Sequence, residues 1–126
     1  MSAYVPCFAM TTARITATLR HALETSDFAA WRECLAPDAV LSATVCGRRF
    51  HGTGPEQIVA THGSMYPRPS AIFEWCETPA AGGVVVKFAQ RRGDGADRRY
   101  AVELAIEAGR VAAEVVHSGT LPVPTR

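Results

Sequence analysis

The sequence has 126 residues, of which 48% are hydrophobic and 20% are charged, as in a single globular domain that can bury a core without disulfides or metal ions. Its net charge of +1 predicts binding neither to nucleic acid nor to an anionic membrane surface. No apolar run approaches the roughly 20 residues of a membrane span, and no basic segment marks a secretory signal. We therefore expect a cytoplasmic protein.

The four cysteines are widely spaced, with no Cys-x-x-Cys pair and no histidine at a metal-ligand interval. This spacing argues against a zinc site, and we expect no metal ion and no other cofactor. Cys34 and Cys46 stand inside apolar patterns, which predicts small core residues in a reducing compartment.

Two helical patterns follow residues 1–11, which we expect to form a flexible extension. The first begins at Thr12, and its apolar residues recur at helical spacing. Ser26 or Asp27 can cap a second, shorter helix, which Pro37 ends because the residue before a proline is disfavoured in the α region. The two apolar stripes are Ile15, Leu19, Ala22 and Leu23, and Phe28, Trp31 and Leu35.

A strand and a third helix come next. Residues 40–46 are β-branched or small, which predicts a strand, and residues 47–49 are typical of a turn. Thr53 and Glu56 have the spacing of a capping box at the start of a helix, which Pro67 ends. The expected buried positions are Leu41, Ala43 and Val45 in the strand, and Ile58, His62 and Met65 in the helix.

The rest of the chain consists of four strand-like runs separated by glycine-containing turns. Short connections between successive strands predict antiparallel neighbours. We therefore predict one α+β domain over residues 12–119, followed by a flexible tail at 120–126. The runs are 71–77, 84–91, 98–107 and 110–118, and Tyr100, Val102, Leu104 and Ile106 share one face of the third run.

This order of elements, with Pro37-Asp38-Ala39 entering the first strand and Phe50-His51-Gly52 preceding the third helix, resembles the nuclear transport factor 2-like superfamily. The similarity is to the branch of the SnoaL-like polyketide cyclases and ketosteroid isomerase. It implies a cone-shaped half-barrel in which three N-terminal helices pack on a curved, mostly antiparallel sheet. It also implies a pocket between the concave sheet face and the helices, and a homodimer formed through the convex face.

The residues that perform the ketosteroid isomerase reaction are absent from this sequence. The resemblance places Ala43 at the position of the general base, Leu19 at that of the oxyanion-hole tyrosine, and Val102 at that of the protonated acid. The isomerase mechanism needs a base and two donors at these places, so we do not expect it. The Asp-Arg-Asp cluster of limonene epoxide hydrolase is not evident either. We expect these three positions, with Trp31 and Leu104, to line the substrate pocket.

His62 and Glu114 are the candidates for acid/base catalysis. By the resemblance, His62 stands where several relatives have a pocket tyrosine, and an imidazole suits proton transfer at neutral pH. The alternative is a core histidine bonded to a backbone carbonyl. Glu114 enters the pocket if its face of the last strand points inward, whereas the opposite parity brings in His117 and leaves Glu114 as an edge or dimer-face carboxylate.

Tyr66, Trp75 and Tyr100 are polar-tipped aromatics that can line a hydrophobic pocket and donate a hydrogen bond to a ligand, or simply fill the core. The pairs Arg91-Arg92 and Arg98-Arg99 are expected to form the solvated basic tip of a hairpin, since they lack the interleaved aromatics of a nucleic-acid platform.

The sequence therefore predicts a protein with a pocket for a small hydrophobic molecule. The first hypothesis is a cofactor-independent SnoaL-like cyclase, isomerase or dehydratase that acts on an oxygenated substrate, with His62, Glu114 and Tyr100 as catalytic residues. The alternative is a non-catalytic ligand-binding or dimerisation module of the same fold.

Overall fold

The computed structural model of the protein describes residues 11–91 and 97–120. The predicted extension apart from Thr11, the predicted turn at 93–95 and the predicted tail apart from residue 120 lie outside these residues. The helices are α1 (Thr12–Thr25), α2 (Ala29–Cys34) and α3 (Pro55–Met65), and the strands are β1 (Leu35–Val45), β2 (Arg48–Thr53), β3 (Ala71–Ala80), β4 (Gly83–Arg91), β5 (Asp97–Glu107) and β6 (Arg110–Thr120).

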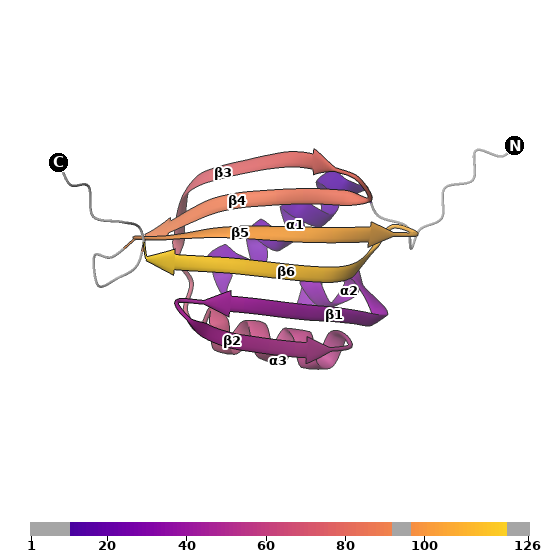
Figure 1. Cartoon of the computed structure of the whole chain (residues 1–126), viewed down its shortest axis with the longest axis horizontal. Coiled ribbons are helices and arrows are strands. Elements are labelled where there is room, and N and C mark those ends of the chain that lie inside the picture. Colours follow the sequence, from indigo (N-terminus) through magenta and orange to yellow (C-terminus); the bar gives the residue numbers. More distant parts are fainter. Residues whose placement is uncertain (1–10, 92–96, 121–126) are drawn as a thin grey trace, which may run out of the picture.

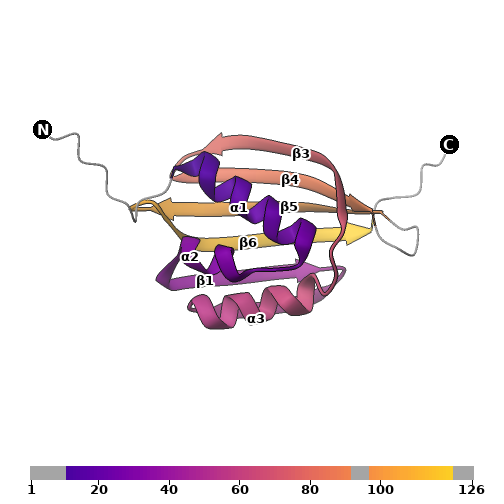
Figure 2. The same cartoon turned by 180° about the vertical axis from the view of Figure 1, so that it is seen from behind.

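The strands form one curved, open sheet in the order β2-β1-β6-β5-β4-β3. Strands β1 and β6 are parallel, and all other neighbours are antiparallel. In the described part of the chain, all helices lie on one face of the sheet, and the other face, here called the outer face, is uncovered (Figures 1 and 2). The predicted α+β class with a mostly antiparallel sheet is confirmed.

The hydrophobic core lies between the helices and the inner face of the sheet. Each helix is too short to be stable alone, and burial of its apolar stripe against the sheet stabilises it. The predicted stripes are confirmed: the buried core positions include Ile15, Leu19, Ala22 and Leu23 in α1, Phe28, Trp31 and Leu35 around α2, Leu41, Ala43 and Val45 in β1, Ile58, His62 and Met65 in α3, and Tyr100, Val102 and Leu104 in β5.

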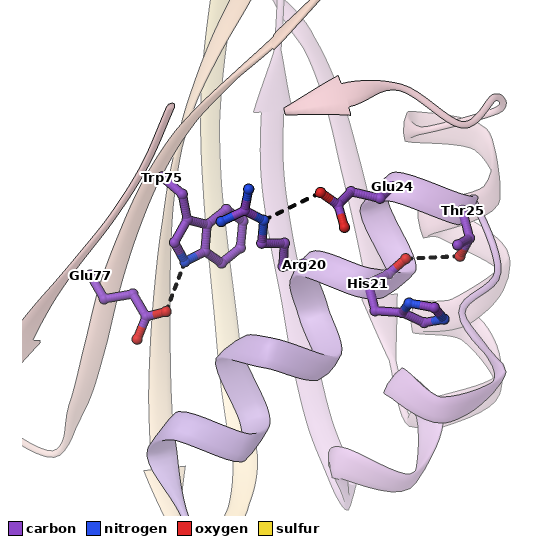
Figure 3. Close-up of polar contacts among 6 residues, drawn as sticks. All are labelled: Arg20, His21, Glu24, Thr25, Trp75 and Glu77. Atoms are coloured by element: carbon purple, nitrogen blue, oxygen red, sulfur yellow. Dashed lines mark hydrogen bonds and ion pairs between the residues drawn. The ribbon is translucent and has the colours of Figure 1, made fainter. Parts of the chain in front are cut away.

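Polar contacts attach α1 to the edge strand β3. The Thr16 hydroxyl donates to Glu77 Oε1 at 2.9 Å, and Trp75 Nε1 donates to Glu77 Oε2 at 2.7 Å. The Arg20 guanidinium stands 5.3 Å from the centre of the Trp75 ring and also pairs with Glu24 (Figure 3). These contacts are formed largely at exposed groups, so they orient α1 more than they stabilise it.

Strand β2 was not predicted, because Thr53 is the one β-branched residue in 48–53 and residues 47–49 are typical of a turn. It forms by antiparallel pairing with β1, from Val45 opposite Arg48 to Val40 opposite Thr53. The turn that joins them has positive φ at Cys46 (51°) and Gly47 (83°). Cys46 is therefore exposed in a turn, and its predicted core position is wrong.

Two predicted element ends also differ. The capping box is wrong: Gly54 is the N-cap of α3 without a side-chain cap, and Gln57 Oε1 accepts from the Thr53 backbone N–H at 2.9 Å instead. The second helix ends at Cys34, and β1 begins at Leu35 and passes through Pro37. This is possible because the pairing of β1 with β6 is interrupted between Leu35 and Val40.

We predict opposite effects of alanine at two glycines. A Cβ at Gly83 would lie 1.8 Å from the Leu104 carbonyl oxygen on β5, so Gly83→Ala forces the β4–β5 pair apart and lowers the free energy of unfolding by about 1–3 kcal/mol. A Cβ at Gly63, inside α3, meets no atom within 4 Å. Gly63→Ala should therefore raise the free energy of unfolding by about 0.5–1 kcal/mol. Urea unfolding measures the free energy of unfolding of both variants. If Gly83→Ala changed it in the same direction and by the same amount as Gly63→Ala, this register of β4 and β5 would be contradicted.

Candidate functional site

An acid/base pair lies inside the core. The Nε2 atom of His62, on α3, is 2.9 Å from Oε2 of Glu114, on β6, and neither side chain has any exposed surface. His62 belongs to the buried stripe of α3, and Glu114 points from the centre of the sheet toward the helices beside the buried Val116. His117 is exposed on the outer face. Of the two predicted orientations of β6, the structure therefore has the one in which Glu114 points inward and His117 outward.

The polar atoms of this pair are incompletely satisfied. His62 and Glu114 approach each other without the in-line geometry of a hydrogen bond, and His62 Nδ1 and Glu114 Oε1 have no hydrogen-bond partner among the described residues. The same holds for the indole nitrogen of Trp31. Because an unsatisfied buried polar group costs about 1–3 kcal/mol, three such side chains in one cluster of the core point to a role other than stability.

Aromatic rings surround the imidazole and connect it to the sheet. The Phe28 ring meets the His62 ring edge-on at 4.9 Å between centres, and the Trp31 ring lies 6.3 Å away. The Tyr66 ring, which stacks on Phe28 at 5.9 Å, is 5.5 Å from His62 and 5.4 Å from the Tyr100 ring. The alternative prediction of a histidine bonded to a backbone carbonyl does not describe this environment, in which the groups around His62 are rings and a carboxylate.

A pocket of about 700 Å³ opens at one end of the domain, and we call it the end pocket. It lies where the β1–β2 turn, the segment after α3 and the ends of β4 and β5 meet. Tyr66 and Tyr100 line it, whereas His62 and Glu114 do not. Tyr66 thus contacts the buried pair on one side and the pocket on the other. The described lining residues are Val45, Cys46, Arg48, Phe50, Ser64, Met65, Tyr66, Pro67, Arg68, Pro69, Ser70, Gln90, Arg91, Arg98 and Tyr100.

Four of these lining residues are arginines, and no aspartate or glutamate is among the described ones. Arg98 is partly buried at this pocket. Its Nη1 donates to the Tyr100 hydroxyl oxygen at 3.4 Å, and its buried Nε has no partner in the described part of the chain. The predicted solvated tip at residues 91–92 and 98–99 is therefore wrong for Arg98, which borders the pocket.

No protein-family model matches the sequence, and no curated protein is significantly similar to it. Solved structures are similar in fold. An NTF2-like protein of unknown function from Mesorhizobium loti matches 88% of this chain and 91% of its own, at 18% identity and a TM-score of 0.71. One from Burkholderia xenovorans matches 89% and 88% at 18% identity, with a TM-score of 0.68. The chain has the nuclear transport factor 2-like fold.

A third similar structure comes from Catenulispora acidiphila. It is a hypothetical protein with a ketosteroid isomerase-like fold in complex with trimethylamine, 17% identical over 84% of this chain and 85% of its own, with a TM-score of 0.64. At these identities the similarity is one of fold. The predicted resemblance to nuclear transport factor 2-like proteins is confirmed for the fold by all three structures.

Within this fold, most of the predicted lining residues belong to the core. Leu19, Trp31, Ala43, Val102 and Leu104 are buried, and none of them lines the end pocket. They belong to the hydrophobic core. Their contact with a ligand stays a prediction, and their burial away from the end pocket does not favour it.

Trp75 is also remote from the end pocket. It stacks on Phe88 at 5.5 Å and lies under Arg20 of α1. It borders a second, wider hollow of about 890 Å³ over β3–β6, to which no helix residue contributes. This hollow lies on the outer face, because its lining includes the outward-pointing side chains of Lys87, Ala101 and His117. The predicted homodimer through this face stays a prediction.

Two further expectations concern membranes and metals. No helix in the described ranges is both long and apolar enough to cross a membrane. Within the same ranges, no three His, Cys, Asp or Glu side chains come together in a way that could hold a metal ion. The cytoplasmic location stays a prediction.

Sequence reasoning missed the arginines of the end pocket. The available signal was strand alternation: Arg98 stands two residues before Tyr100, which was predicted to point inward, so both share a face. Arg48 could not be found in this way, because β2 was not predicted. Arg68 lies in a loop, whose course no periodicity predicts.

Both tyrosine hydroxyls of the pocket stay protonated at neutral pH. Burial, followed by the proximity of Tyr100 and Glu114, raises the pKa of Tyr66 well above its usual value, against a smaller opposing effect of Arg98. Burial likewise raises the pKa of Tyr100, although hydrogen bonds with Arg98 and Ser118 oppose it. The two phenols can therefore donate hydrogen bonds to a ligand oxygen but cannot act as bases.

The raised pKa of Tyr66 predicts a loss of stability in alkali. Above the unfolded value of about 10, the unfolded chain releases the Tyr66 proton while the folded chain retains it, so the free energy of unfolding falls as pH rises. Tyr66→Phe removes this contribution. We expect the free energy of unfolding of wild type minus that of Tyr66→Phe to decrease by up to about 1.4 kcal/mol per pH unit above pH 10.

Urea unfolding at several pH values between 8 and 11 measures this difference. Below pH 9 the difference should be constant, which serves as the internal control. A difference that stays constant up to pH 11 would show that the Tyr66 hydroxyl is not buried beside Glu114.

Proposed function

We propose that this protein binds a small, oxygenated hydrophobic molecule in the end pocket and acts on it by proton transfer, with His62 and Glu114 as the acid/base pair. The contact of these two side chains at 2.9 Å, without exposed surface, supports this proposal. A buried pair of this kind is often no more stabilising than apolar residues of similar volume. Its presence in an otherwise apolar core is therefore better explained by chemistry than by stability.

The roles follow from the chemistry of the groups. The His62 imidazole accepts a proton from a carbon next to a carbonyl: the C–H bond breaks, and its electron pair forms an enolate on the carbonyl oxygen. The hydroxyls of Tyr66 and Tyr100 donate hydrogen bonds to that oxygen. The imidazolium, stabilised by the Glu114 carboxylate, then returns the proton to another carbon or to a hydroxyl group that leaves as water.

Tyr66 controls access in this proposal. Its ring lies between the imidazole and the pocket, 5.5 Å from His62, and it lines the pocket itself. The substrate reaches the imidazole only when the Tyr66 side chain turns aside. The motion has a suitable location, since Tyr66 follows the last residue of α3 and precedes Pro67, outside regular secondary structure.

A second function is favoured by one observation. Neither His62 nor Glu114 lines the end pocket, and a buried pair that never meets the ligand has no catalytic role. Binding without turnover then describes the pocket. The protein with a ketosteroid isomerase-like fold that binds trimethylamine supports ligand binding in this fold generally.

A double variant separates the two functions. His62→Leu or Glu114→Leu alone leaves a buried polar partner unpaired and should lower the free energy of unfolding by about 3–5 kcal/mol. The double variant His62→Leu/Glu114→Leu fills the same space with apolar groups, so we expect it to be at least as stable as wild type. Urea unfolding of all four proteins measures this non-additivity.

The same double variant tests the reaction. Wild-type protein is incubated in D₂O with a panel of small ketones, enones and hydroxyketones, and nuclear magnetic resonance detects deuterium incorporation or loss of water. We expect turnover with wild type and none with the folded double variant, while binding of the same compound is retained. Unchanged turnover in the double variant would overturn the role of the pair, and binding without turnover in wild type would establish the second function.

A further inference from the structure

We propose that the end pocket is selective for a molecule with an apolar body and a carboxylate head group. This inference rests on the proposed function, because it specifies the ligand class of the same pocket. It does not depend on the buried pair, since it concerns binding alone.

Positive charge surrounds the end pocket, and the described residues compensate little of it. Arg48, Arg68, Arg91 and Arg98 line it, and only Arg91 has a carboxylate partner in the described part of the chain, Asp97 at 3.5 Å. Outside the pocket, Arg20 pairs with Glu24, Arg32 with Glu56 and Arg99 with Glu74. Arg14, Arg49 and Arg110 have no carboxylate partner among the described residues, but they do not gather at one concave site. Like charges around one concave site repel each other and focus a positive field into it, and both effects favour an anion there.

Strand alternation separates neighbouring arginines between the pocket and the outer face. Arg98 lines the pocket, whereas Arg99 forms a two-pronged ion pair with Glu74 on the outer face. In β2, Arg48 lines the pocket and Arg49 does not. Arg98 and Arg48 come from strands at different places in the sheet, β5 and β2. The tertiary structure, and not the local sequence, therefore brings them to one cavity.

Arg98 and Tyr100 form the most defined part of this site. The Arg98 Nε is buried without a partner in the described residues, and Nη1 contacts the Tyr100 hydroxyl at 3.4 Å. Arg48 is positioned by Phe50, whose ring centre is 5.1 Å from its guanidinium carbon. A guanidinium matches the two oxygens of a carboxylate through parallel N–H donors, and a phenol hydroxyl can donate a further hydrogen bond to them.

Part of the pocket lining suits an apolar body. Its lining includes Val45, Phe50 and Met65 and two proline rings, Pro67 and Pro69. A volume of about 700 Å³ is large enough for a molecule with one or two rings. An inorganic anion would leave these apolar surfaces uncovered, which is why we infer an organic carboxylate and not a free phosphate ion.

Calorimetric titration of the full chain with 2-naphthoate and with 2-naphthamide tests the inference, because the two probes have the same ring system and differ in charge. We expect the acid to bind at least tenfold more tightly than the amide at low ionic strength, and this advantage should decrease as salt is added. Inorganic phosphate serves as a second probe and should compete weakly.

Matched arginine variants locate the effect. Arg98→Gln and Arg48→Gln should each weaken 2-naphthoate binding by about tenfold and leave 2-naphthamide binding unchanged. Arg49→Gln, which removes the same charge one residue away on the other face of β2, should leave both affinities unchanged. Thermal unfolding confirms that the variants are folded, and Arg48, near the edge of the sheet, provides a test even where Arg98→Gln does not fold.

Equal affinities for the acid and the amide, or equal losses in Arg48→Gln and Arg49→Gln, would overturn the inference. Phosphate that competes as well as 2-naphthoate would overturn the carboxylate assignment. The variant His62→Leu/Glu114→Leu should bind 2-naphthoate like wild type. Loss of turnover in that variant with retained carboxylate selectivity supports both proposals, and selectivity in a wild-type protein without turnover supports this one alone.

Discussion

The alternation of side chains along the strands of a sheet that is covered on one face only is the constraint on which this structure depends. Strand β6 shows it most directly. It lies between β1 and β5, with Leu41 and Leu104 directly opposite Glu114. The parity that buries Val116 also buries Glu114 and exposes His117, and a shift by one residue would exchange the two titratable groups. Helix α3 completes the site by placing His62 above this position.

The cone is closed by aromatic rings, and the polar pair is enclosed among them. The series Phe28, His62, Tyr66, Tyr100 and Phe88 continues from the helices across the sheet, with successive ring centres 4.8–5.5 Å apart. Such a packed interior differs from the open hollow that the fold suggests. A ligand in the end pocket therefore meets phenol hydroxyls first, and the imidazole lies one ring further in. In the proposed reaction, the position of Tyr66 between the two controls access to the imidazole.

The near-neutral total charge conceals a local separation of charge. Several arginines on the surface form ion pairs, for example with Glu24, Glu56 and Glu74, which contribute little free energy because they are exposed. Those at the end pocket differ in having few acidic neighbours among the described residues. The near-neutral total charge argues against large anionic partners such as nucleic acid. It says nothing about one concave site, where a few guanidinium groups with little compensation among the described residues dominate the field.

Periodicity in the sequence was sufficient to predict the α+β class, all three helices, five of the six strands and the inward face of β1, α3 and β5, because each of these follows from local spacing of apolar residues. Residue type and the family resemblance added His62, Glu114, Tyr66 and Tyr100 as polar groups that could lie inside. Only the tertiary structure decided that β2 exists, that Glu114 and not His117 faces His62, and that Arg48, Arg68 and Arg98 reach one cavity. These outcomes depend on strand pairing and register between segments far apart in the chain, and local patterns do not encode a register.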